Sequence, residues 1–197
     1  MRTILSLILT FYVTLTYSQV IDWNNFDNKL IDSLVLKEAN NYRKSHSNSE
    51  LTHSSLLYER ISIRQTRLQR ERQRAFHPPM ETLFNQIEDS LIVETENNNP
   101  GKISRNKRFL MTEICLRTHK QDNKFTTYQE LATYLIKLWK SSSAHNNFLV
   151  NWATKYESTY GIGAVSVQIG DFYWGGGTFI GIYASFQIGM TYLILIN

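Results

Sequence analysis

The sequence predicts an α+β fold in a single domain. Three segments, at about 29–45, 51–76 and 127–140, carry apolar residues at the spacing of one helix face. Three other segments, 109–117, 160–169 and 179–188, have the apolar and β-branched composition of strands. A chain of 197 residues, 42% of them hydrophobic, is long enough to bury one sizeable core.

The N-terminus is predicted to be a secretory signal peptide at residues 1–18. Arg2 gives it a positive start, residues 4–15 form an apolar run, and small residues precede Gln19. The run is too short to span a bilayer comfortably, although an uncleaved membrane anchor is the alternative. We therefore expect a secreted or periplasmic protein, with an N-terminal segment at 19–28 and the folded domain at 29–197.

Cys115 is the only cysteine, so an intramolecular disulfide is impossible. An exported domain without disulfides must be stabilised by its core, which suits a bacterial exported protein. Cys115 lies in an apolar strand segment, where a buried thiol is expected rather than a reactive one.

The second predicted helix, 51–76, ends at His77 because Pro78 and Pro79 cannot continue it. His77 is thereby held at a helix boundary. The sequence is compatible with three roles for it: a helix-capping residue, a core residue or a site residue.

The same helix carries much of the positive charge of a chain whose net charge is +4. Arg60, Arg64 and Arg67 share one of its faces. This face is either simply solvated or a peripheral membrane contact that meets anionic lipid head groups or acidic glycan. Nucleic acid is not an expected partner, because an exported protein seldom meets it.

Residues 94–108 are polar and rich in turn formers, and they are predicted to be a surface linker. The strand that follows contains Glu113 between apolar neighbours. A carboxylate in such a place is costly to bury unless it meets a cation, a metal or a hydrogen-bonded histidine. Glu113 is therefore a candidate site residue, with Glu94 or Glu96 as a rival.

The helix at 127–140 begins with a capping box formed by Thr127 and Glu130. Three serines follow it, which favours a turn and predicts that His145 lies on a short exposed corner. Ser142 precedes His145 by three residues, so a nucleophile pair can be imagined. Nothing in the local sequence marks the oxyanion hole and orienting acid that such a pair needs.

The C-terminal strands are joined by a glycine-rich turn at about 171–177. Its three glycines, Gly175 to Gly177, lack the lysine and the following helix of a phosphate-binding loop. We expect a hairpin there rather than a nucleotide site.

Four segments together resemble the CAP superfamily (cysteine-rich secretory, antigen 5 and pathogenesis-related proteins), in its bacterial SCP-like extracellular branch. They are Asn41-Tyr42-Arg43, Thr112-Glu113-Ile114, the Trp139-to-His145 spacing with its apolar continuation, and the strand at 160–169. The order and spacing of the segments carry the resemblance, which covers about residues 29–189.

The resemblance implies an α-β-α sandwich, in which helices flank an antiparallel sheet, and a cleft with two histidines and two acids. Carried over by position, these are His77, Glu113 and His145, with Ser142 where the second acid is expected. Two imidazoles and a carboxylate can hold a metal such as zinc, or the histidines can simply hydrogen-bond Glu113. The implied function is a binding or interaction module for a lipid, sterol or cell-wall ligand. The alternative is a zinc-dependent hydrolase.

Overall fold

The computed structural model describes residues 19–75, 87–98, 107–120, 124–151 and 161–193. They form an α+β fold around a mixed four-stranded sheet with the strand order β1-β3-β4-β2. The strands are β1 (Leu51–His53), β2 (Lys107–His119), β3 (Gly161–Trp174) and β4 (Gly177–Leu193). The predicted signal peptide at 1–18 and His77 lie outside the described residues.

The sheet departs from the predicted antiparallel arrangement at one edge. β3 pairs antiparallel with β4, and β4 with β2, whereas β1 pairs in parallel with β3. Parallel neighbours need a long connection, and here the chain passes through helices and β2 between β1 and β3.

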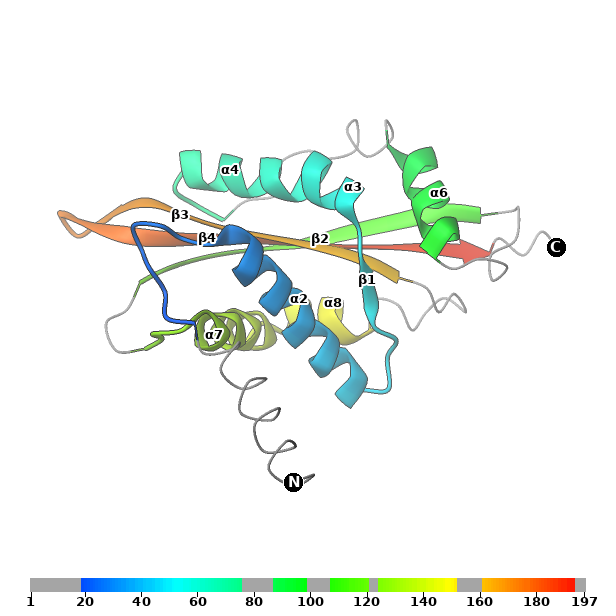
Figure 1. The fold of residues 1–197 in the computed structure, drawn as a ribbon, viewed down its shortest axis with the longest axis horizontal. Helices are drawn as coiled ribbons and strands as arrows, with labels where there is room; N and C mark the ends of the chain where they lie inside the picture. Colours follow the sequence, from blue (N-terminus) through cyan, green and yellow to red (C-terminus); the bar gives the residue numbers. More distant parts are fainter. Residues whose placement is uncertain (1–18, 76–86, 99–106, 121–123, 152–160, 194–197) are drawn as a thin grey trace, which may run out of the picture.

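Helices cover both faces of the sheet (Figure 1). On one face lie α2 (Asn28–Ser45), α7 (Tyr128–Lys140) and α8 (Ser143–Asn151). On the other lie α3 (Ser55–Leu57), the π-helical turn η1 (Tyr58–Ser62), α4 (Ile63–Glu71) and α6 (Glu88–Asn98). Within the described ranges, none of the helices is long and apolar enough to cross a membrane.

Two of the predicted helices are confirmed to within a residue at each end. The Asp27 side chain accepts a hydrogen bond from the Leu30 amide at the start of α2. The capping box of α7 is present in full, since Thr127 accepts from the Glu130 amide and the Glu130 carboxylate accepts from the Thr127 amide.

The second predicted helix is wrong at its start, because Leu51–His53 forms β1. The Asn40 side chain bonds both the amide and the carbonyl of Leu51, which holds that residue extended. Ser54 then caps the helix by accepting from the Leu57 amide.

Two predicted loops are shorter than expected. Residues 94–98 belong to α6, whose Leu91 and Thr95 are buried. β3 runs to Trp174 and β4 starts at Gly177, so the hairpin turn is Gly175 and Gly176. Both glycines have positive φ, +58° and +79°, which a two-residue hairpin turn requires.

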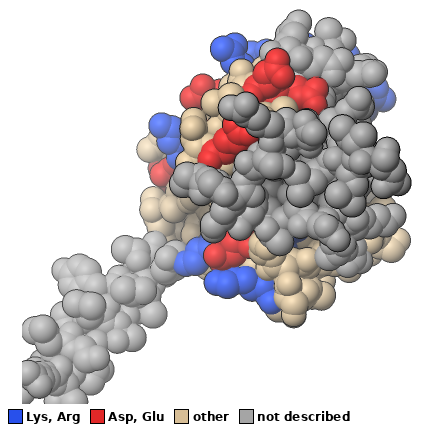
Figure 2. All heavy atoms as spheres, turned by 90° about the vertical axis from the view of Figure 1, so that its right-hand side faces the viewer, with Lys and Arg blue, Asp and Glu red and all other residues tan. Residues whose placement is uncertain are grey.

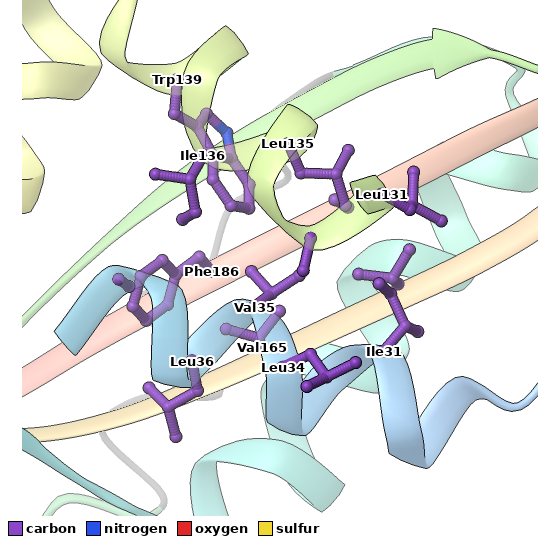
Figure 3. Packing of buried hydrophobic residues seen from close by; sticks show 14 of the residues in the cluster. Ile31, Leu34, Val35, Leu36, Leu131, Leu135, Ile136, Trp139, Val165 and Phe186 are labelled. Carbon is purple, nitrogen blue, oxygen red and sulfur yellow. The ribbon is translucent and has the colours of Figure 1, made fainter. Parts of the chain in front are cut away.

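The larger hydrophobic cluster lies between the sheet and the helices α2, α7 and α8 (Figure 3). Ile31 and Val35 of α2 and Leu131, Leu135 and Trp139 of α7 are all fully buried there. They pack against Val165 of β3 and Phe186 of β4. The cluster on the other face is smaller and consists of Leu57, Ile61, Ile87, Leu91, Ile162 and Ala164.

Asp32 closes the edge of β3 beyond the short strand β1. Its Oδ1 accepts a hydrogen bond of 2.6 Å from the Val167 amide, and its Oδ2 accepts one of 2.8 Å from the Tyr58 hydroxyl. One carboxyl group thus joins α2, η1 and β3, which come from three different layers. Burial raises the pKa of Asp32 to about 8, although both hydrogen bonds act in the opposite direction.

Arg43 fixes the loop after α2 to the end of α8. Its side chain is buried, and it donates from Nε to the Ser49 carbonyl (3.0 Å) and from Nη1 to the Leu149 carbonyl (2.8 Å). Burial lowers the pKa of its guanidinium group from the ordinary value.

Candidate functional site

Glu113 lies near the middle of β2, opposite Gln187 of β4. The Gln187 amide donates to Glu113 Oε2 at 3.1 Å. The side chain of Glu113 is half-buried, so a hydrogen-bonding partner compensates part of its lost hydration. The partner is the amide of a glutamine, whereas the sequence led us to expect a cation, a metal or a histidine beside this carboxylate.

Gln187 extends this contact into a polar chain between the sheet and the helix above it. It is fully buried, its Oε1 accepts from the Ser62 hydroxyl of η1, and its Nε2 also donates to Ser185 Oγ at 2.5 Å. Glu113 therefore faces the helix layer of η1 and α4, whereas its neighbour Ile114 belongs to the large apolar cluster on the other face.

The underside of α4 is polar where an apolar face was predicted. Its buried residues are Gln65, Thr66 and Gln69, whereas Leu68 is only half-buried. The Thr66 hydroxyl has its hydrogen-bond acceptors close by, since it lies within donating distance of the carbonyl oxygens of Ser62 (2.9 Å) and Ser166 (3.1 Å). We call Ser62, Gln65, Gln69, Glu113, Cys115, Ser185 and Gln187 the polar layer.

Two glutamines of the polar layer hold buried atoms that lack a hydrogen-bond partner. They are Oε1 of Gln65 and both amide atoms of Gln69, judged within the part of the chain that the structure describes. Gln69 is completely buried, and its nearest polar neighbours include the Cys115 thiol, a weak donor and acceptor. Each such atom costs about 1–3 kcal/mol of folding free energy relative to a satisfied one.

Cys115 is buried, as predicted. Burial is the largest cause that raises the pKa of its thiol, and the nearby Glu113 raises it further. The thiol therefore stays protonated at neutral pH, which makes it a poor nucleophile.

His145 does not lie on an exposed corner, and that prediction is wrong. The three serines end α7 and begin α8, because the Ser142 carbonyl accepts from the Asn146 amide at 2.8 Å. Serine is as favourable at a helix start as in a turn. His145 consequently sits half-buried on the first turn of α8, two residues after Ser143.

A groove of about 440 Å³ lies between α2 and α7. Tyr42, which lines the groove, donates to Asn146 Oδ1 at 2.8 Å, and Lys140 Nζ lies 4.0 Å from the centroid of its ring. The Asn41–Arg43 segment and the His145 segment are therefore adjacent, although the joining residues Tyr42 and Asn146 are 104 positions apart in the chain. They lie on the α2 and α7 side of the sheet, whereas Glu113 faces α4.

Of the predicted zinc ligands, His77 lies outside the described residues, and Glu113 faces η1 and α4, whereas α8, which carries His145, covers the other face of the sheet. Within the described ranges, no group of three or more His, Cys, Asp or Glu residues has the arrangement of a metal site. The zinc site stays a prediction.

Glu94, the rival of Glu113, has a capping role. Its carboxylate accepts from the Ser54 hydroxyl, from Ser55 Oγ at 3.2 Å and from the Leu56 amide at 3.4 Å. A negative charge at this position stabilises the start of the helix that continues through η1 into α4.

The predicted basic face is exposed to solvent. Arg60, Arg64 and Arg67 all have exposed side chains, and Arg67 lies 3.8 Å from the Glu71 carboxylate in an ion pair at the surface. Such exposed pairs contribute little to stability.

No protein-family model matches this chain, and no curated protein resembles it closely in sequence.

The sequence contained a signal for the polar layer that apolar periodicity overlooks. Ser62, Gln65 and Gln69 recur at the spacing of one helix face, between the arginines of the opposite face. A helix that carries polar, uncharged residues on the face opposite its arginines, and that must pack on a sheet, indicates a polar contact surface.

Proposed function

We propose that this protein is an exported CAP-like module that binds a lipid, a sterol or cell-wall material at the polar layer. The resemblance of the segments around Glu113, Trp139 and His145 supplies the family. Helices on both faces of a central sheet support a CAP-like sandwich, with the parallel strand β1 as a departure of three residues.

The observation that carries the proposal is the buried amide of Gln69, which has only the weak Cys115 thiol as a polar partner among the described residues, in the same layer as the Glu113 and Gln187 pair. Buried polar groups without partners are rare in proteins, and those that persist call for an explanation such as a functional role. An amide and a carboxylate at the same interface suit the hydroxyl or amide groups of a sterol or a cell-wall fragment. The apolar cluster beside them suits the rest of a lipid.

Replacement of Gln69 by leucine separates binding from stability. Gln69→Leu removes the two unpaired atoms and keeps much of the volume, so we expect it to raise the free energy of unfolding by about 1–3 kcal/mol. If the amide binds ligand, the same change weakens binding about tenfold, in the pattern of a trade-off between stability and function.

Binding is measured with three probes: a fluorescent sterol, a fluorescent fatty acid and soluble peptidoglycan fragments. Gln129→Leu is the matched control, because Gln129 lies on α7, on the other face of the sheet, and bonds Glu38 at 2.8 Å. Failure of all three probes to bind the wild-type protein, or unchanged binding by Gln69→Leu, overturns the proposal.

Zinc titration distinguishes this proposal from the zinc-dependent hydrolase. A metal held by His77, Glu113 and His145 gives heat above buffer with the wild-type protein and less with His145→Ala. His53→Ala, a change of an exposed histidine on β1, is the control. Absence of heat with the wild-type protein excludes a zinc-dependent reaction.

A further inference from the structure

The β3–β4 hairpin extends beyond the helices on both faces of the sheet (Figure 1). Its tip is the Gly175–Gly176 turn, and its last strand residues are paired, Trp174 with Gly177 and Tyr173 with Thr178. The projection is therefore a continuous ladder of backbone hydrogen bonds. It presents its side chains in a fixed arrangement.

Large aromatic side chains are exposed at this end. Trp174 is 67% exposed, Tyr173 59% and Phe179 40%. Neighbouring residues of a strand point to opposite faces, so Tyr173 is on one face of the hairpin and Trp174 on the other. Phe179 pairs with Phe172 and shares the face of Trp174. The tip is therefore aromatic on both sides.

His119 of β2 organises the aromatic rings on the Trp174 face. Its ring centroid lies 6.0 Å from that of Phe172, 5.9 Å from that of Phe179 and 6.4 Å from that of Trp174. The Arg117 guanidinium lies 4.5 Å from the Phe172 centroid. These contacts hold the rings in place. At such an exposed position a polar residue would cost the protein little stability, so the exposed aromatic residues call for a functional explanation.

Basic residues lie directly behind the aromatic tip. The stem of Arg70 packs over Gly170, and Arg117 donates to the Gln73 carbonyl at 2.6 Å, which places the end of α4 beside the hairpin. Arg72 and Arg74 follow at this end of α4, and Lys120 follows β2. Figure 2 shows the opposite end of the molecule, which includes α6 and carries acidic side chains together with some lysines and arginines. On the hairpin itself, Asp171 of β3 is an exposed acidic residue three positions before Trp174.

We propose that the hairpin tip inserts into the interface of an anionic lipid bilayer. Trp and Tyr prefer the boundary between water and hydrocarbon, and basic residues behind them meet the acidic head groups. A tip that is aromatic on both faces suits a medium that surrounds it, whereas stacking on a sugar needs one flat platform. The inference goes beyond the proposed ligand site, from which the tip is separate.

The test uses the full chain after export and vesicles of phosphatidylcholine with or without phosphatidylglycerol. We expect flotation with the anionic vesicles only, and weaker binding at high salt. Paired replacement of Trp174 and Phe179 by serine should lower the vesicle affinity about tenfold, since it removes the interfacial aromatic residues. Val93→Ser is the matched control, because Val93 is an exposed apolar residue of α6, 53% accessible.

A second measurement identifies the inserted residue. Brominated phospholipid should quench the tryptophan fluorescence of the bound protein, and Trp174→Phe should keep most of the binding and lose the quenching. Wild-type protein that does not float with anionic vesicles, or a serine variant that floats equally well, overturns the proposal. A wild-type protein that binds insoluble peptidoglycan but not vesicles, together with a serine variant that binds neither, would overturn the proposal and show that the tip binds glycan instead of lipid. None of these results depends on Gln69, so the two proposals fail separately.

Discussion

At the scale of single residues, Asp32 shows how one side chain can connect layers that the backbone leaves apart. The Val167 amide faces the open edge of the sheet, where β1 has already ended, and a buried amide without an acceptor would be costly. Asp32 accepts that hydrogen bond and a second one from Tyr58. Burial, and then Asp32 itself, raises the pKa of Tyr58 in turn, so the phenol remains protonated and continues to donate.

Asp32 should make stability depend on pH in an unusual direction for a carboxyl group. Its pKa is raised from 3.8 to about 8 in the folded protein, mainly by burial. The folded state therefore favours the protonated form. The stability that this contributes is complete below pH 3.8 and is lost as the pH rises towards 8.

We expect Asp32→Asn to flatten the fall in unfolding free energy between pH 4 and pH 8, in a series of urea titrations. Asparagine can still accept from the Val167 amide and can donate to the Tyr58 oxygen. Asp22→Asn, a change of an exposed carboxyl group, is the control. A wild-type stability that rises steadily across this range would contradict the assignment.

At the scale of elements, α7 is the helix that its local sequence specifies most completely. Thr127 and Glu130 form the capping box, and Thr126 adds an amide and a hydroxyl bond to the same carboxylate, at 2.7 and 2.9 Å. The Thr126 and Thr127 amides lower the pKa of Glu130 to about 2. Glu130 therefore supports the helix above pH 4.5, and this support is lost as the pH falls towards 2.

Thr127→Ala should lower the free energy of unfolding by about 1 kcal/mol, because it leaves one orphan amide of the first turn without its acceptor. Thermal or urea unfolding at neutral pH measures the loss. Thr133→Ala, on the exposed side of the same helix, should have a much smaller effect. Equal losses in the two variants would show that the cap is unimportant.

The sequence predicted the elements whose signals are local. Helices α2 and α7 have apolar stripes and caps, and the strands β2 to β4 have apolar runs. It failed where a distant residue decides the conformation. Leu51 is extended because Asn40 bonds its backbone on both sides, and residues 94–98 are helical because α6 packs its Leu91 and Thr95 inward.

The candidate site was predicted only in part, again because residues distant in the sequence complete it. Glu113 stood out because a carboxylate among apolar neighbours needs a partner. Its partner Gln187, 74 positions away, is recognisable only once β2 and β4 are in register. Gln65 and Gln69 escaped notice because periodicity searches for apolar faces, and the packed face of α4 is polar.

At the scale of the whole molecule, the two helix layers are attached to the sheet by different forces. α7 buries Leu131, Leu135 and Trp139, whereas α4 buries glutamines and a threonine. Apolar burial contributes about 25 cal/mol per Å², and buried polar contacts contribute much less in net terms. The layer of η1 and α4 should therefore open at a lower free energy than the layer of α2 and α7.

Hydrogen exchange under native conditions tests this difference. We expect the amides of α4 to exchange faster than those of α7, with the central strands β3 and β4 slowest. Gln69→Leu should slow exchange in α4 and leave α7 unchanged. Protection in α4 equal to that in α7 would show that the polar layer holds as firmly as the apolar one.

The residues that hydrogen-bond to α2 are synthesised late. Asp32 bonds Val167, 135 positions further on, and Arg43 bonds Leu149 across 106 positions. During synthesis from the N-terminus, α2 has neither its sheet nor its neighbouring helix until most of the chain has emerged, and closing such long loops is slow. A nascent chain halted before β3 has no complete core to form, so an early stop leaves an unfolded fragment rather than a smaller version of the protein.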